Sequence, residues 1–128
     1  MMNAQQLPGA NPDGIDVVDR KVLEAMARGD AAVEREFITL YRRLNREDME
    51  KLRQAIAEGD IAGALHTAHR ISGAARMIGA ASLAAVGGVV EAASRAGNMH
   101  DVEANLPALE QQVLLVDNYL ESFLLEKR

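Results

Sequence analysis

The sequence predicts an all-α fold, an up-and-down antiparallel four-helix bundle with a short extra N-terminal helix. Three observations support this prediction. Alanine, leucine and valine supply most of the apolar content, and alanine and leucine are good helix formers. Glycine followed by aspartate or asparagine recurs as a paired helix stop and start. No alternating β-branched run suggests a strand, and short connections favour antiparallel helices.

Each predicted helix is bounded by such a signal. The glycine takes the left-handed conformation that ends a helix, and the next side chain accepts the free N–H groups of the following helix. The pairs are Gly29-Asp30, Gly59-Asp60 and Gly97-Asn98, and Gly79 is a further stop with Ser82 as a possible start. The helices are therefore expected near residues 16–28, 31–58, 60–78, 81–96 and 99–126.

Two residues test the continuity of the longer helices. Asn45 is a possible interruption of the second helix, although Glu47 and Lys51 at i, i+4 favour continuity. Pro107 is expected to kink or restart the last helix, because proline removes a helix hydrogen bond.

Composition limits the domain organisation and the class of function. Residues 1–14, rich in proline and glycine, are expected to form a flexible leader, and residues 15–128 a single domain. The absence of cysteine excludes disulfides and thiolate metal sites. The net charge of −5 argues against nucleic-acid binding, and the local cluster Arg42, Arg43 and Arg46 is interpreted as a solvated helical face. With no signal peptide and no apolar run of roughly 20 residues, a cytoplasmic protein without membrane insertion is expected.

The helix near 60–78 carries the candidate functional residue. Its apolar stripe, which is expected to face the core, consists of Ala64, Ala68, Ile71, Ala75 and Ile78. His69 lies about 100° around the helix from Ala68 and is expected to be exposed. Its own stripe is polar or small and consists of Ala62, His66, His69, Ser72, Gly73 and Arg76. Small side chains at i+3 and i+4 leave room for a reaction at the imidazole.

This region resembles the histidine-containing phosphotransfer (HPt) domains of two-component phosphorelays. The resemblance rests on the run Ala68-His69-Arg70-Ile71-Ser72-Gly73-Ala74-Ala75-Arg76-Met77-Ile78-Gly79-Ala80 and on a second helix from Leu83 through Glu91 to Arg95. The layout matches from about Ile15 to the C-terminus.

The resemblance implies that His69 is a phosphoacceptor. It would receive a phosphoryl group from one receiver-domain aspartate and pass it to another, so the implied partners are response-regulator receiver domains and a hybrid sensor histidine kinase. The chain has no Gly-rich phosphate loop, so it is expected to be a carrier and not an enzyme with its own nucleotide site. No cofactor of its own is expected, and Mg²⁺ would be held by the receiver.

The sequence departs from the family at two positions. Ser72 stands where the family usually has a lysine, and Glu91 stands where a glutamine or similar group faces the histidine. Glu91 is expected to hold one imidazole tautomer. The cations expected to compensate its charge near a phosphoryl group are Arg95 and either Arg70 or Arg76.

Further residues around His69 are predicted to support it. His66 is interpreted as a solvated neighbour of His69. Val18, Val22 and Met26 of the first helix are expected either to dock the partner or only to fasten this helix to the core. Gly87-Gly88 is interpreted as a site of close helix packing.

Two alternatives remain at this point. One is an HPt-like interaction module that binds receiver or kinase domains without carrying phosphate. The other is a metal site built on His66 and His69 and completed by Glu91 or His100, which the outward direction of the histidines disfavours. A monomer is expected, because the pattern shows no second long apolar stripe.

Overall fold

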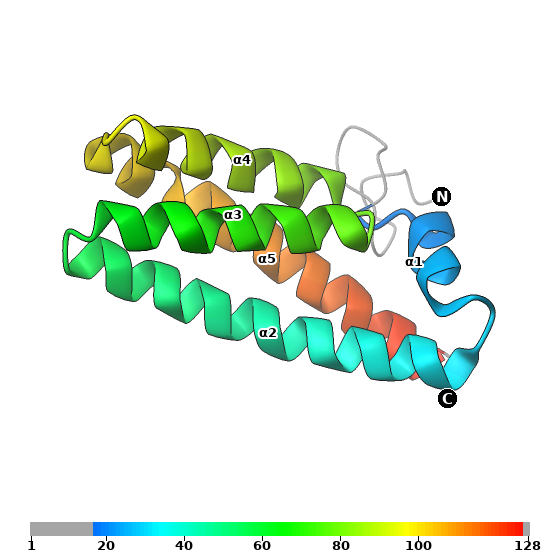
Figure 1. Ribbon diagram of the computed structural model, residues 1–128. Coiled ribbons are helices and arrows are strands. Elements are labelled where there is room, and N and C mark those ends of the chain that lie inside the picture. The colour runs from blue at the N-terminus through cyan, green and yellow to red at the C-terminus, as the bar shows by residue number, and fades with distance from the viewer. Residues whose placement is uncertain (1–16, 127–128) are drawn as a thin grey trace, which may run out of the picture.

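The computed structural model describes residues 17–126 as five α-helices joined by short turns. They are α1 (Arg20–Ala27), α2 (Ala31–Ala57), α3 (Ile61–Met77), α4 (Ala81–Arg95) and α5 (Met99–Glu126). The four longer helices run up and down as a bundle, and α1 lies across the end where α3 turns into α4 (Figure 1). The predicted fold is therefore confirmed. The predicted leader, residues 1–14, lies outside the described residues.

The helix ends follow the predicted glycine signals closely. Gly59, Gly79 and Gly97 all have positive φ angles, between 68° and 78°. The Asp60 side chain accepts the Gly63 N–H and so caps α3. Local sequence signals therefore suffice to place these boundaries, because both partners of each cap lie within one helical turn.

One helix start and one predicted start residue differ from the prediction. The first helix begins at Arg20 and not near residue 16, because the Asp19 side chain caps it by accepting the Lys21 N–H. The fourth begins at Ala81, so Ser82 is inside the helix and no side chain caps this end. A tight turn instead sets this start, since the Ala80 N–H donates to the Ala75 carbonyl.

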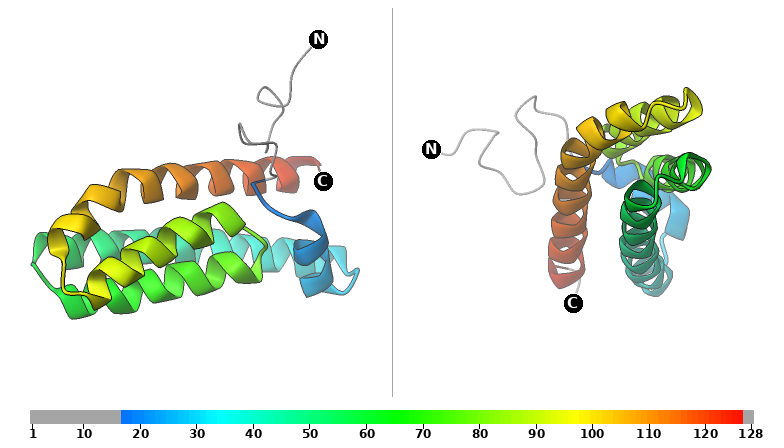
Figure 2. Two further views of the ribbon diagram at one scale, coloured as in Figure 1. Left: turned by 90° about the horizontal axis from the view of Figure 1, so that it is seen from above. Right: turned by 90° about the vertical axis from the view of Figure 1, so that its left-hand side faces the viewer.

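Neither predicted interruption breaks a helix. Asn45 is buried within the continuous α2, and Pro107 is exposed within the continuous α5. Figure 2 shows that the first turns of α5, in gold, run at an angle to the rest of the helix, which agrees with the expected kink.

The core forms where the apolar stripes of the four long helices meet. All five residues of the predicted α3 stripe are fully buried: Ala64, Ala68, Ile71, Ala75 and Ile78. Large side chains from the other helices fill the space around these small residues, among them Leu52, Leu83 and Leu109. The small α3 side chains let α4 pack closely, and α3 with α4 is the most extensive helix pair of the bundle.

The outer face of α2 carries an apolar row that the sequence analysis did not identify. Val33, Leu40 and Leu44 are each 43–46% exposed and lie at i, i+7 and i+11. This row is short, and the expected monomer stays a prediction. None of the helices between residues 17 and 126 is both long enough and apolar enough to span a membrane.

Candidate functional site

His69 projects from the middle of α3 into solvent. Its side chain is 68% exposed, while its neighbour Ala68 is fully buried. A β-carbon added at Gly73, one turn later on the same face, would meet no heavy atom within 4 Å. The predicted exposure and open space at His69 are therefore present.

The opposite helix, α4, holds the imidazole through a carboxylate. The Oε2 atom of Glu91 lies 3.0 Å from Nδ1 of His69. The same oxygen accepts a 2.9 Å hydrogen bond from the Arg95 guanidinium. The Glu91 side chain is only 11% exposed, so one oxygen bridges an imidazole and a guanidinium at the edge of the core. Sequence spacing placed Glu91 opposite His69, and the structure brings the two together.

This contact determines the electrostatics of the pair. Hydrogen bonds from His69 and then from Arg95 hold the pKa of the Glu91 carboxyl below its usual range, against the opposing effect of burial. An ionised carboxylate can only accept, so Nδ1 of His69 carries the proton. The neutral imidazole therefore presents Nε2 as its unprotonated, nucleophilic nitrogen.

Ser72 does not share the exposed face of His69, and this prediction is wrong. Ser72 is fully buried, and its hydroxyl donates to the Ala84 carbonyl on α4 at 3.0 Å. It also packs against Gly87, where an added β-carbon would lie 3.2 Å from the Ser72 Cβ. The predicted close packing is present at Gly87, whereas Gly88 faces open space. A longer side chain in place of Ser72 would have to leave this α3–α4 contact.

The three predicted cations occupy different positions around the site. Arg70 turns toward α2, where it forms an ion pair with Asp48, and so does not face His69. Arg76 is exposed but lies two turns from His69, about 10 Å along the helix axis. Arg95 lies nearest, since it shares the Glu91 oxygen with His69. Among the predicted cations, Arg95 is therefore the one that the structure places beside His69.

A shallow hollow of about 340 Å³ opens beside the imidazole on the N-terminal side of α3. It is lined by Ala62, Leu65, His66, His69 and Arg95. His66 is exposed and has no hydrogen bond among the described residues, which agrees with the interpretation of a solvated neighbour.

The first helix contributes less to the surface than predicted. Val18 precedes α1 and is fully buried in the core, so of its two expected roles the structure shows the one that fastens this segment to the core and not docking. Val22 and Met26 are 36% and 37% exposed. The Asp19 N–H donates to the Gly79 carbonyl at 2.9 Å, which ties the start of α1 to the turn after α3.

Sequence reasoning missed one exposed apolar residue near this end of the site. Met77, in the last turn of α3, is 55% exposed. Two sequence features could have indicated that Met77 is exposed. It does not belong to the buried stripe of α3, and it lies at the helix end, two residues before the helix stop Gly79. Between residues 17 and 126, no group of three or more His, Asp or Glu side chains is arranged to hold a metal ion.

A comparison with solved structures finds the same fold. A solved structure, the histidine-containing phosphotransfer protein B (HptB) from Pseudomonas aeruginosa PAO1, superimposes with a TM-score of 0.82. The two chains are 21% identical, and the match covers 88% of this chain and 97% of the other. At this identity the likeness shows the fold. A search of curated protein sequences finds no significant match.

A match to a protein-family model shows the family of this chain, which the fold alone does not show. The model of the Hpt domain matches residues 36–119, which is more than half of the chain and includes His69 and Glu91. The chain therefore belongs to the Hpt domain family of phosphotransfer proteins.

Proposed function

We propose that this protein is a phosphorelay intermediate that carries a phosphoryl group on His69 between receiver-domain aspartates. One observation carries the proposal: a 68% exposed imidazole is held at Nδ1 by Glu91, so that Nε2 points away from the carboxylate. A fixed tautomer with an accessible unprotonated nitrogen is what nucleophilic attack by histidine requires.

The transfer balances without a proton donor. The Nε2 lone pair of His69 forms the new N–P bond, and the P–O bond to the receiver aspartate breaks. The aspartate leaves as a carboxylate with the bonding electron pair. Nδ1 keeps its proton throughout, so the imidazole ring becomes positively charged in the phosphorylated protein.

Glu91 favours this product for an electrostatic reason. The charged ring stays within hydrogen-bond distance of the carboxylate, 3.0 Å in the unphosphorylated protein. The phosphoryl group sits on the opposite ring nitrogen, so the ring separates it from Glu91. The carboxylate therefore stabilises the positive ring more than it repels the phosphoryl group, because Coulomb energy falls with distance.

The receiver is expected to dock over His69 and the neighbouring end of the bundle. Val22 and Met26 on α1 and Met77 on α3 supply exposed apolar surface there, and exposed apolar groups flanked by charge favour protein contacts. The receiver would bring Mg²⁺ and its acidic pocket, and this chain would contribute the histidine and its positioning groups.

The test is phosphoryl uptake from a panel of phosphorylated receiver domains. Wild type and His69→Gln are compared, with His66→Gln as the matched control on the same face of α3. We expect an acid-labile, alkali-stable label on the wild type and the control, and none on His69→Gln.

Equal labelling of His69→Gln and wild type would exclude His69 as the acceptor. If no donor labels the wild type while receivers still bind it, the protein is an interaction module that does not carry phosphate. Circular dichroism of each variant verifies that the bundle is folded.

A further inference from the structure

The side chain that holds His69 is a carboxylate and not an amide. Oε2 of Glu91 lies 3.0 Å from Nδ1 of His69, at the end of a side chain that is only 11% exposed. An ionised carboxylate only accepts hydrogen bonds, whereas an amide can turn over and donate one. Glu91 is therefore a partner for Nδ1 only while that nitrogen carries a proton. A glutamine in the same place could serve the ring in both of its forms.

The charge of the ring changes when His69 is phosphorylated on Nε2. The new N–P bond uses the Nε2 lone pair, so a ring that keeps its Nδ1 proton becomes positively charged. A ring that loses this proton is neutral and turns the Nδ1 lone pair toward the Glu91 carboxylate. Opposite charges in hydrogen-bond contact attract, whereas a lone pair and a carboxylate repel each other. Glu91 therefore favours the protonated form of the phosphorylated ring.

The other charged groups of α3 and α4 near the imidazole are cationic or titrate as an imidazole does. Arg95 donates to the same Glu91 oxygen at 2.9 Å, so it offsets part of the carboxylate charge. His66 lies beside His69 in the shallow hollow, and Arg76 is about 10 Å away along the helix axis. Among residues 17–126, Glu91 has the one carboxylate within 4.0 Å of the imidazole.

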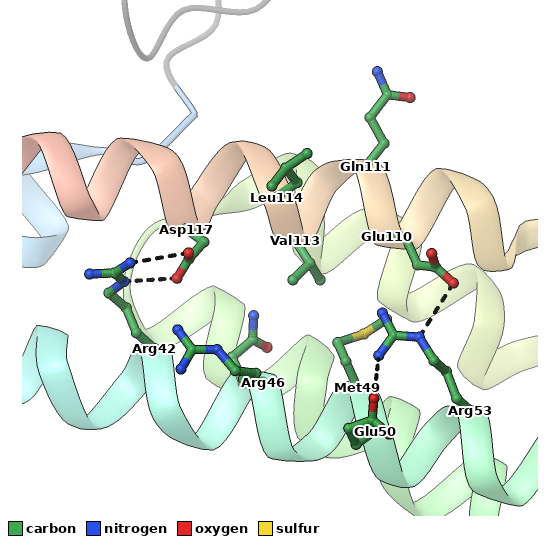
Figure 3. A pocket seen from close by; sticks show the side chains of 11 residues that line it. Arg42, Arg46, Met49, Glu50, Arg53, Glu110, Gln111, Val113, Leu114 and Asp117 are labelled. Atoms are coloured by element: carbon green, nitrogen blue, oxygen red, sulfur yellow. Dashed lines mark hydrogen bonds and ion pairs between the residues drawn. The ribbon is translucent and has the colours of Figure 1, made fainter.

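Carboxylates on the neighbouring helices are paired with arginines and face away from His69. Asp48 on α2 forms an ion pair with Arg70, which turns toward α2. Glu110 on α5 pairs with Arg53 at 3.6 Å, beside a cavity of about 460 Å³ between α2 and α5 (Figure 3). This cavity shares no lining residue with the hollow beside His69. The carboxylate that acts directly on the ring is thus Glu91.

We propose that Glu91 keeps the ring of phosphorylated His69 positively charged to a higher pH than a neutral partner would. This inference rests on the proposed function, because it concerns the phosphorylated histidine. Glu91 is then a positioning residue that also sets the charge of the phosphoryl carrier. The low pKa of the Glu91 carboxyl, caused by hydrogen bonds from His69 and then Arg95, agrees with this role, since the group is ionised wherever an imidazole titrates.

The charge of the ring decides what remains when the phosphoryl group leaves. From the protonated ring, the N–P bond breaks with its electron pair returning to Nε2, and a P–O bond forms to the receiver aspartate. Neutral imidazole remains and keeps its Nδ1 proton. From the unprotonated ring, the same cleavage would leave an imidazolate anion, which is a poor leaving group. By stabilising the charged ring, Glu91 should also shift the transfer equilibrium at neutral pH toward phosphorylated His69.

The test loads His69 without a receiver domain. Phosphoramidate phosphorylates imidazoles directly: the Nε2 lone pair forms the N–P bond, and the P–N bond of the reagent breaks as ammonia leaves. The chain has three histidines, so the full chain carrying His66→Gln and His100→Gln keeps His69 as its single histidine acceptor. Both replaced side chains are exposed, and this parent protein is therefore expected to fold.

The readout is NMR of the ¹⁵N-labelled ring of phosphorylated His69 between about pH 6 and pH 10. Adding Glu91→Gln should lower the midpoint of the ring titration by about one pH unit, because a hydrogen bond to a charged acceptor is about tenfold more favourable than one to a neutral acceptor. Adding Arg95→Gln should raise the midpoint, because a cation is removed from the shared oxygen. Shifts of opposite sign are not expected from a general loosening of the site.

Matched controls come from the carboxylate–arginine pair between α2 and α5. Glu110→Gln and Arg53→Gln remove the same charges as the two test variants, but away from His69 (Figure 3). Both should leave the midpoint where the parent protein has it, because exposed charges beyond about 10 Å are screened by salt. Circular dichroism of every variant verifies that the bundle is folded.

Equal midpoints in the parent protein and Glu91→Gln would overturn the inference, and so would an equal shift in Glu110→Gln. Failure of phosphoramidate to phosphorylate His69 would also overturn it, because Nε2 would then not be the available nucleophile. The proposed function is tested separately with phosphorylated receivers. If the midpoint shifts as expected but no receiver labels the wild type, the proposed function fails and the role of Glu91 stands.

A receiver that labels the wild type gives a second measurement. At about pH 7, the equilibrium ratio of phosphorylated chain to phosphorylated receiver should be up to tenfold higher for the wild type than for Glu91→Gln. The same receiver is used for both proteins, so its own pH dependence cancels. An equal ratio for the two proteins, despite labelling of both, would contradict the role of Glu91 while leaving phosphotransfer by His69 intact.

Discussion

Ser72 on α3 packs directly against Gly87 on α4. A β-carbon at position 87 would lie 3.2 Å from the Ser72 Cβ and 3.3 Å from its Cα. The space at position 87 is therefore limited by the backbone of Ser72 and not by the movable tip of a side chain. This contact sets the separation of the helices that carry His69 and Glu91.

Gly87→Ala is expected to destabilise the protein by roughly 1–3 kcal/mol, because α3 and α4 must move apart. Gly88→Ala is the matched control. An added methyl group there meets nothing within 4 Å, so replacing a helical glycine should stabilise by about 0.5–1 kcal/mol. Urea unfolding measures both. A Gly87→Ala protein as stable as Gly88→Ala would show that the contact adjusts freely.

The stability contributed by Glu91 should depend on pH in one direction. His69 and Arg95 lower the pKa of this carboxyl in the folded protein, so the folded state favours its ionised form. The contribution is present above the unfolded-state pKa, about 4.3, and is lost as the pH falls through the lowered folded-state value. The stability difference between wild type and Glu91→Gln should therefore shrink between about pH 5 and pH 3.

Urea unfolding at a series of pH values checks this prediction. Glu103→Gln, which changes an exposed glutamate of α5, is the control and should show no such trend relative to wild type. A Glu91→Gln difference that stays constant down to about pH 3 would contradict the proposed coupling to His69.

Arg28, the residue that ends α1, is expected to be suboptimal. It has a φ of 51°, in the left-handed region, which costs a non-glycine residue about 1 kcal/mol. Arg28→Gly should therefore raise the free energy of unfolding by about that amount. Ala25→Gly, inside the same helix, should lower it by about 1 kcal/mol. Chemical denaturation of both variants measures their free energies of unfolding. Changes of opposite sign would show that the left-handed backbone conformation of residue 28, and not the added glycine itself, causes the gain.

Arg42 and Asp117 should be coupled energetically across the α2–α5 interface. Two hydrogen bonds of 2.8 and 3.1 Å join them, and their side chains are 20% and 29% exposed. A double-mutant cycle with alanine should give a favourable coupling of about 1 kcal/mol. The exposed pair Arg53 and Glu50 should give about 0.3 kcal/mol. Equal coupling energies for the two pairs would mean that burial and bidentate geometry do not strengthen the Arg42–Asp117 interaction.

The predictable parts of this structure are those set by local chemistry. The start of α3 follows from Asp60, whose acceptor and donor lie three residues apart. The buried face of α3 follows from helical periodicity, and so does the exposure of His69. Spacing together with the family resemblance placed Glu91 opposite His69.

The errors arise where a distant segment decides the outcome. Positions i+3 and i+4 from His69 share a helical face, yet α4 covers Ser72 and leaves Gly73 open, and the pattern within α3 does not contain the path of α4. Arg42 looked solvated because its partner Asp117 is 75 residues away. Val18 is apolar in either role, so only the fold decides that it is buried.

His69 and its carboxylate partner are only 22 residues apart, on two consecutive helices joined by one tight turn. The reacting group and the group that orients it therefore belong to a single helical hairpin, which closes at a small entropic cost. Substitutions on the exposed faces of α2 or α5 are therefore expected to leave this pair in place. The geometry at the imidazole thus depends on the short turn from α3 to α4 and on the close packing of those two helices.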